Sequence, residues 1–141
     1  MNYRTHIVSS LSEIGQVQWD ALVALQDAPN PFLSFAFLHA LHESGSATPE
    51  TGWQPQYIAL YDAVDGLAAA LPLYVKGHSY GEYVFDWAWA NAYQEHGLDY
   101  YPKLLSAIPF TPVAGPRLLA RDARARAALV DVLVKTQKAT A

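Results

Sequence analysis

The chain has 141 residues, of which 52% are hydrophobic and 16% charged, enough apolar content for one modest core and too much for an intrinsically disordered protein. Its 9 Lys and Arg against 13 Asp and Glu give a net charge of -4, so it lacks the basic surface with which proteins bind nucleic acid directly. The absence of Cys excludes disulfides, thiolate metal sites and thiol catalysis.

The N-terminal third of the chain predicts one strand and two helices. Residues 3–9 have the mixed character of a strand, and a helical apolar stripe of Trp19, Leu22 and Val23 or Leu25 follows Gly15. Ser34 can cap a second helix, over 35–44, which ends at Gly45. The opening residues lack the apolar region of a secretory signal, and we expect a cytoplasmic protein without a membrane span.

The middle of the chain predicts a β-hairpin. Residues 57–61 are β-branched and aromatic, Asp65-Gly66 is a turn signal, and residues 67–75 form the returning arm. Pro72 has no N–H to donate, which implies an edge, a bulge or a break in the ladder. Residues 83–85 predict a further strand.

The C-terminal part predicts a strand or short helix over 103–108 and a final helix over 123–138. The final helix is expected to bury Ala127, Val130, Leu133 and Val134 and to expose Arg126, Asp131 and Lys135. We expect an α/β protein, of the α+β kind with a mixed sheet. Because a helix with one apolar stripe must cover a sheet face, helices 16–26 and 35–44 are expected to pack on that sheet.

Several common chemistries have no matching motif. His39 and His42 are three apart on a predicted helix, but no third ligand is evident and we predict no metal. There is no nucleophile elbow and no Walker phosphate loop. Residues 94–99 begin a phosphate-cradling pattern, but Asp99 replaces its last small residue, so a helix ending at Gly97 is expected and no cofactor is predicted for this segment.

The segment DWAWANAYQEHGLDYYPK, residues 86–103, combines aromatic and polar side chains unusually densely. Aromatic walls with a few directional polar groups are the usual composition of a small-molecule or sugar pocket. An aromatic core with a polar rim is an equal alternative from composition alone. The residues predicted to bind a substrate are Trp87, Trp89, Asn91, Tyr101 and Lys103.

Three blocks carry a resemblance to a known family: NPFLS at 30–34, YGEYVFDW at 80–87 and PFTPV at 109–113. With them the chain, from Trp19 to the last helix, resembles the FemAB-like family of peptidoglycan biosynthesis and recognition proteins, often described as GNAT-family acyltransferases. The resemblance implies two GNAT-like units side by side, of which residues 1–141 would be the first, N-terminal unit, cut off before the second.

The family's activity sets the functional expectation. Relatives transfer an amino acid from aminoacyl-tRNA to an amine on a cell-wall precursor, so the resemblance implies an acyl or aminoacyl transferase. The second unit would hold the donor, acyl-CoA or aminoacyl-tRNA, while residues 86–103 line the acceptor groove. By itself the fragment would be inactive and would self-associate through uncovered apolar surface.

Acyl transfer to an amine suggests particular roles for the residues near this segment. Glu82 or Asp86 could receive a proton, and Tyr101, Asn91 or Lys103 could donate hydrogen bonds to the developing oxyanion. The alternative function is a non-enzymatic module that recognises a glycan or peptide through Trp87 and Trp89.

Overall fold

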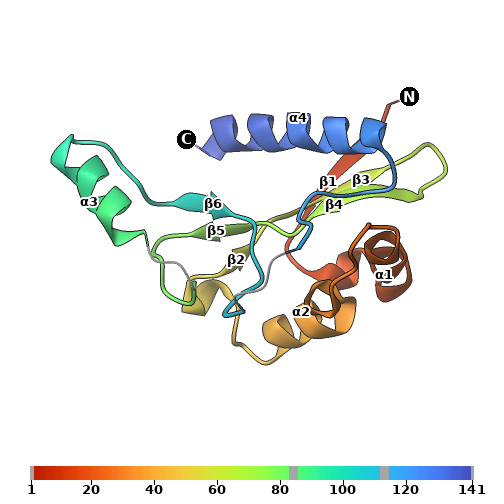
Figure 1. Cartoon of the computed structure of the whole chain (residues 1–141), viewed down its shortest axis with the longest axis horizontal. Helices are drawn as coiled ribbons and strands as arrows, with labels where there is room; N and C mark the ends of the chain where they lie inside the picture. Colours follow the sequence, from red (N-terminus) through yellow and green to blue (C-terminus); the bar gives the residue numbers. More distant parts are fainter. Residues whose placement is uncertain (1, 83–85, 112–114, 141) are drawn as a thin grey trace.

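The computed structural model describes residues 2–82, 86–111 and 115–140, so the strand predicted at 83–85 lies outside the described residues. The strands are β1 (Arg4–Val8), β2 (Gln54–Pro55), β3 (Tyr57–Tyr61), β4 (Leu67–Leu71), β5 (Tyr74–Lys76), β6 (Lys103–Leu105) and β7 (Leu119–Ala120). The α-helices are α1 (Gln16–Ala24), α2 (Phe35–Glu43), α3 (Trp87–Glu95) and α4 (Ala123–Thr140). The predicted α+β class is confirmed (Figure 1).

The strands form two sheets rather than one, with the orders β1-β3-β4-β7 and β2-β5-β6. Every pairing among the described residues is antiparallel, so the prediction of a mixed sheet is wrong for this part of the chain. The predicted hairpin is confirmed for β3 and β4, in which Ile58 lies opposite Leu71. Its returning arm, however, is not one strand, because β4 ends just before Pro72 and β5 pairs in the second sheet. Pro72 therefore marks the break at which the chain changes sheets.

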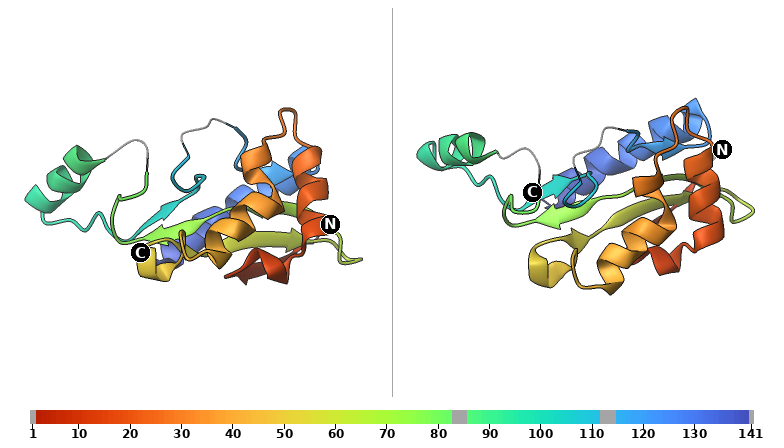
Figure 2. Two further views of the ribbon diagram at one scale, coloured as in Figure 1. Left: turned by 90° about the horizontal axis from the view of Figure 1, so that it is seen from below. Right: turned by 60° about the horizontal axis from the view of Figure 1, so that its bottom comes forward.

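The first sheet is covered on both faces. In Figures 1 and 2, α4 lies across one face and α1 and α2 lie across the other. Side chains alternate along a strand, so Tyr57 and Ala59 of β3 join the core beneath α1 and α2, whereas Ile58 and Leu60 join the core beneath α4. All five residues of β3 are consequently buried.

The core beneath α1 and α2 follows the predicted helical stripes. Trp19, Leu22 and Val23 are buried, while Leu25 is exposed. The Trp19 indole stacks on Tyr57 with 5.9 Å between ring centres and donates a hydrogen bond of 2.7 Å to the Leu33 carbonyl. This bond satisfies the indole N–H inside the core.

The last helix forms as predicted, but its buried face differs from the prediction. Ala125 and Leu129 are fully buried, and Leu133 is partly buried. In contrast, Ala127, Val130 and Val134 are exposed. Both sets recur at helical spacing, so periodicity alone could not decide which of the two apolar stripes faces the sheet. The predicted exposure of Arg126, Asp131 and Lys135 is confirmed.

The second sheet leads to α3, which projects at one end of the molecule (Figure 1). The helix closes as its sequence predicts, with Gly97 at φ 70° and the Leu98 N–H bonded to the Tyr93 carbonyl at 2.8 Å. In the described part of the chain, no helix has the length and apolar character that crossing a bilayer requires.

Candidate functional site

Two lysines face each other across the second sheet. Lys76 of β5 and Lys103 of β6 are direct partners in the antiparallel ladder, a position in which like charges repel. Glu82 lies between them, with one carboxylate oxygen 3.0 Å from the Lys76 ammonium and the other 2.8 Å from that of Lys103. Asp86 lies 2.7 Å from Lys103. These four residues, the charge cluster, therefore balance two positive against two negative charges.

The charge cluster is largely withdrawn from solvent. The side chain of Lys76 is 0% exposed, and those of Glu82, Lys103 and Asp86 are 10%, 14% and 17% exposed. The Lys76 ammonium also donates a hydrogen bond to the Tyr80 carbonyl and lies 3.9 Å from the centre of the Trp53 ring. A buried charge is stable only when close partners offset the loss of its contacts with water.

Ser79 connects the charge cluster to two tyrosines. Its buried hydroxyl donates to Asp86, accepts a hydrogen bond of 3.0 Å from Lys103 and bonds to the Tyr101 hydroxyl at 2.5 Å. The Tyr100 hydroxyl donates to the second oxygen of Asp86, also at 2.5 Å. The network thus ties the segment before α3 to the segment that follows it.

Hydrogen bonding sets the protonation states of these groups. Burial alone would raise the pKa of Asp86, but hydrogen bonds from Lys103, Ser79 and Tyr100 outweigh it and hold that pKa well below its ordinary value. The hydrogen bond that the Tyr100 hydroxyl donates to Asp86, together with burial, raises the pKa of Tyr100 well above its ordinary value. Burial would lower the pKa of Lys103, yet its bonds to Asp86 and Glu82 raise it. Asp86 and Lys103 are therefore charged at neutral pH.

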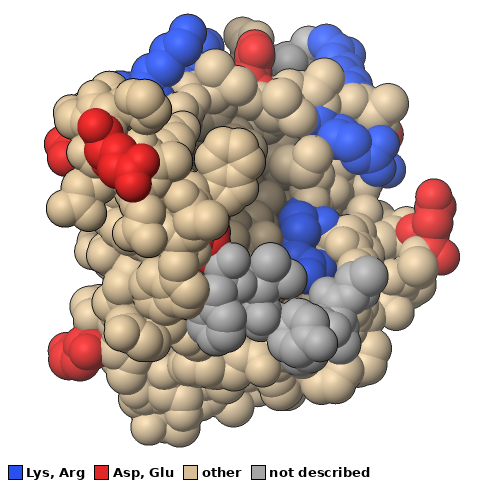
Figure 3. Space-filling view, turned by 60° about the vertical axis from the view of Figure 1, so that its left-hand side comes forward, with Lys and Arg blue, Asp and Glu red and all other residues tan. Residues whose placement is uncertain are grey.

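A cavity of about 450 Å³ lies beside this network, within the range of sites for small ligands. The segment leading into β6 forms most of its wall, and α4 contributes Gln137. We name this cavity the β6 groove; its lining residues are Asp99, Tyr100, Tyr101, Pro102, Lys103, Leu104 and Gln137. The molecule is hollowed on the side seen in Figure 3, where a Lys or Arg side chain lies within the hollow.

Comparison with protein-family models assigns the chain. The model of the FemAB-like proteins, described as peptidoglycan biosynthesis and recognition, matches residues 10–141. The chain belongs to the FemAB-like family. Comparisons with curated proteins and with solved structures found no match. The predicted resemblance is therefore confirmed at the level of the family.

The FemAB-like chain brings together some of the predicted site residues. Asp86, Tyr101 and Lys103 meet around Ser79, and Glu82 joins them through Lys103. The predicted pairing of a carboxylate with hydrogen-bond donors is thus present in space, although the chemical roles assigned to these residues stay predictions.

The predicted residues of α3 are exposed, in contrast to the charge cluster. Trp87 and Trp89 are 42% and 67% exposed, and Asn91 is exposed as well. Among the described residues, no hydrogen bond joins Trp89 or Asn91 to the charge cluster. Trp87 packs edge-on against Tyr80, with 5.4 Å between ring centres. A single groove containing both α3 and β6 residues stays a prediction.

Three tyrosines of the aromatic segment pack ring against ring. Tyr93 of α3 packs edge-on against Tyr100, which in turn packs edge-on against Tyr101, with ring centres 5.1 Å and 5.0 Å apart. Tyr100 therefore contacts α3 and, with Tyr101, lines the β6 groove, and a substrate-binding role for these rings stays a prediction.

Sequence reasoning missed Lys76, Ser79 and the role of Tyr100. A Lys directly after the apolar run 67–75 was a usable signal, since a lysine at the end of a buried strand needs a partner. Ser79 carried no signal, because its importance comes only from its position between distant segments. Within the described residues, no group of three or more His, Cys, Asp or Glu side chains is placed to hold a metal ion.

Proposed function

We propose that this FemAB-like protein forms the acceptor side of an acyl or aminoacyl transferase whose acceptor is an amine-bearing cell-wall precursor. Family membership links the chain to peptidoglycan biosynthesis or recognition. The observation that supports the finer proposal is the β6 groove, which presents the carboxylate of Asp99 together with tyrosine rings beside the charge cluster. A carboxylate with aromatic neighbours is suited to an ammonium group on a peptide.

Transfer to an amine requires removal of a proton from the attacking nitrogen. The lowered pKa of Asp86 makes it a weak proton acceptor, and three donors already occupy its oxygens. We therefore give the positioning of Tyr100 and Lys103 to Asp86 and the proton-accepting role to Glu82, which would exchange one of its two ammonium partners for the acceptor amine. To donate a hydrogen bond to the acceptor or to the developing oxyanion, Lys103 would exchange one of its three present hydrogen bonds, and Tyr101 would exchange its bond to Ser79.

The acyl donor, acyl-CoA or aminoacyl-tRNA, belongs in this proposal to a second GNAT-like unit. The net charge of -4 opposes the binding of a polyanionic donor by residues 1–141. Asp99 also stands where a phosphate-cradling loop requires a small neutral residue. This chain by itself should consequently bind such donors weakly.

Calorimetric titration with a synthetic cell-wall stem peptide that carries a free lysine amine tests the acceptor role. We expect saturable binding that weakens about tenfold, or 1.4 kcal/mol, in Lys103→Gln and Tyr101→Phe. The exposed control Lys135→Gln should bind like the parent chain. Acetylation of the peptide's lysine should abolish the binding; equal affinity for the acetylated peptide would contradict recognition of the amine.

A recognition module is the second candidate, and the exposed indoles of Trp87 and Trp89 favour it. Exposed aromatic rings on one helix are suited to stacking on sugar rings. Titration with a soluble peptidoglycan fragment, followed by tryptophan fluorescence, separates the two functions. Binding that depends on Trp89 and is indifferent to Lys103 would favour recognition over transfer.

A further inference from the structure

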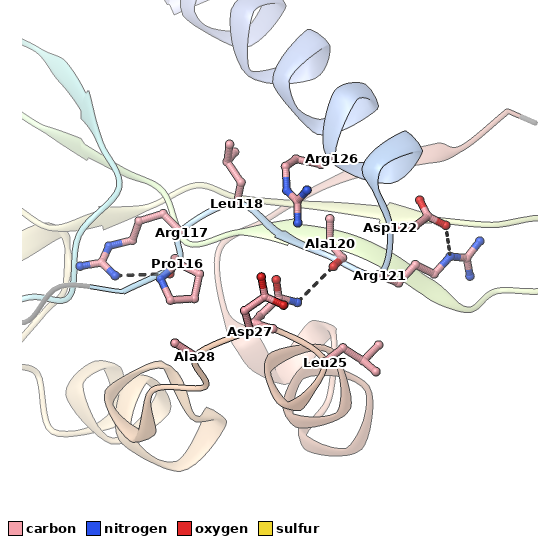
Figure 4. Close-up of a pocket in the computed structure, with 11 residues that line it drawn as sticks. Leu25, Asp27, Ala28, Pro116, Arg117, Leu118, Ala120, Arg121, Asp122 and Arg126 are labelled. Atoms are coloured by element: carbon pink, nitrogen blue, oxygen red, sulfur yellow. Dashed lines mark hydrogen bonds and ion pairs between the residues drawn. The ribbon is translucent and has the colours of Figure 1, made fainter.

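A second cavity, of about 560 Å³, lies on another part of the molecule, between the end of α1 and the segment that carries β7 and the start of α4. Figure 4 shows residues from both segments around it. Apolar side chains, among them Pro116, Leu118 and Ala120, form part of the wall. This cavity, the α1–α4 cavity, shares no lining residue with the β6 groove.

Two opposite charges face each other across the α1–α4 cavity. Asp27 follows α1 and Arg126 lies in the first turns of α4, and their side chains approach the cavity from opposite walls (Figure 4). Both residues are exposed, and no ion pair joins them among the described residues. A carboxylate and a guanidinium are thus held on either side of an open space.

Gln26 adds a fixed acceptor to the wall. It is only 8% exposed, and its amide nitrogen donates to the Leu22 carbonyl at 2.8 Å and the Ala120 carbonyl at 3.2 Å. These two bonds fix the amide, which leaves its Oε1 as the remaining acceptor. Within the described residues, no hydrogen bond reaches this Oε1, so a nearly buried side chain that lines the cavity retains an unused acceptor.

The other charged residues of the wall already have structural roles. Arg121 pairs with Asp62 at 2.6 Å, and Arg117 donates to the carbonyls of Gly115 and Pro116. Asp122 accepts a hydrogen bond of 2.8 Å from the Ala125 N–H at the start of α4. Asp27 and Arg126 are the charged residues of the wall whose side chains make no hydrogen bond or ion pair within the described residues.

We propose that the α1–α4 cavity binds a small zwitterion of the amino-acid type. Its ammonium group would meet Asp27 and the Gln26 Oε1, and its carboxylate would meet the Arg126 guanidinium, which suits planar carboxylates. A simple anion would leave Asp27 unpaired, and a simple cation would leave Arg126 unpaired. The apolar wall would contact the side chain of the ligand, and the volume leaves room for a dipeptide.

Calorimetry with matched ligands tests this proposal. The probes are L-leucine and L-alanyl-L-leucine, and the controls are 4-methylpentanoate, which lacks the ammonium group of leucine, and 3-methylbutylamine, which lacks its carboxylate. At least one zwitterion should bind at least tenfold more tightly than both controls. If neither zwitterion binds, or if either control binds equally well, the proposal is wrong.

Three variants locate the site. Asp27→Asn and Arg126→Gln should each weaken zwitterion binding at least tenfold, whereas Arg124→Gln, at an exposed position of the same helix, should leave it unchanged. Thermal unfolding without ligand verifies that each variant is folded. Retained affinity in Arg126→Gln would overturn the assignment. Lys103→Gln should not affect this binding, so failure here is distinguishable from failure of the proposed acceptor role.

Discussion

Lys76 is the residue at which the cost of a buried charge is clearest. Removing an ammonium group from water costs several kcal/mol, which only close partners offset. Glu82, the Tyr80 carbonyl and the Trp53 ring are those partners. Burial nevertheless lowers the pKa of Lys76 more than Glu82 raises it. The burial of Lys76 thus depends on these partners.

We expect Lys76→Ala to destabilise the chain by about 3 kcal/mol, because it leaves the buried Glu82 with one cationic partner instead of two. The exposed control Lys135→Ala should change the free energy of unfolding by less than about 0.5 kcal/mol. Urea unfolding of the two variants and the parent measures the difference. Equal stability of Lys76→Ala and the control would show that the charge cluster contributes no net stability.

Among the elements, α2 depends on a contact from α1 at its start. The Phe35 N–H donates to the Asp20 carboxylate at 2.9 Å, and the Phe37 N–H donates to the Ser34 hydroxyl at 3.3 Å. A carboxylate at this position also interacts favourably with the helix dipole. Asp20 therefore joins two helices that cover the same face of the sheet.

Substitution of Asp20 by Ala should lower the free energy of unfolding by about 1 to 2 kcal/mol, since the Phe35 N–H loses its acceptor at a partly buried helix end. Asp131→Ala is the matched control, on the exposed face of α4, and should have almost no effect. Chemical denaturation of both variants provides the comparison. A loss in Asp131→Ala as large as that in Asp20→Ala would attribute the effect to net charge rather than to the cap.

Elements set by local sequence were predictable, as was the pairing of β3 with β4 across a tight turn, whereas pairings between distant segments were not. The hairpin turn follows from Asp65-Gly66, with Asp62 accepting hydrogen bonds from the Val64 and Gly66 N–H groups. Pro72 indicated a break after β4, but nothing local indicates that β5 pairs in a different sheet, or that β7, two residues long, pairs with β4. Such pairings depend on contacts between segments distant in the chain.

For the molecule as a whole, contacts between distant segments also limit how much of the candidate site could be predicted from the sequence. The aromatic segment and its nearby carboxylates stood out in the sequence, and the structure brings Asp86, Tyr101 and Lys103 together around Ser79. Lys76 joins them only because β5 pairs with β6, a pairing that no motif encodes. Sequence could therefore indicate the segment of the site but not its charge balance.

The charge cluster should make the stability of the whole chain depend on pH in the acid range. The folded-state pKa of Asp86 lies below its unfolded value, so its contribution is fully present above about pH 4 and is lost as pH falls further. The alkaline range is less informative, because the pKa of Lys103 is raised whereas that of Lys76 is lowered. These two shifts oppose each other as pH rises.

Urea unfolding of the parent chain and Asp86→Asn across the acid range tests this expectation. Near pH 7 the parent should be more stable by about 2 kcal/mol, the usual value of hydrogen bonds to a charged group. The difference should shrink as pH falls below about 4, because the parent then loses the same charge that the variant lacks. Asp131→Asn, at an exposed position, should follow the parent throughout. A difference that stays constant down to about pH 2 would mean that the ionised carboxylate of Asp86 does not stabilise the fold.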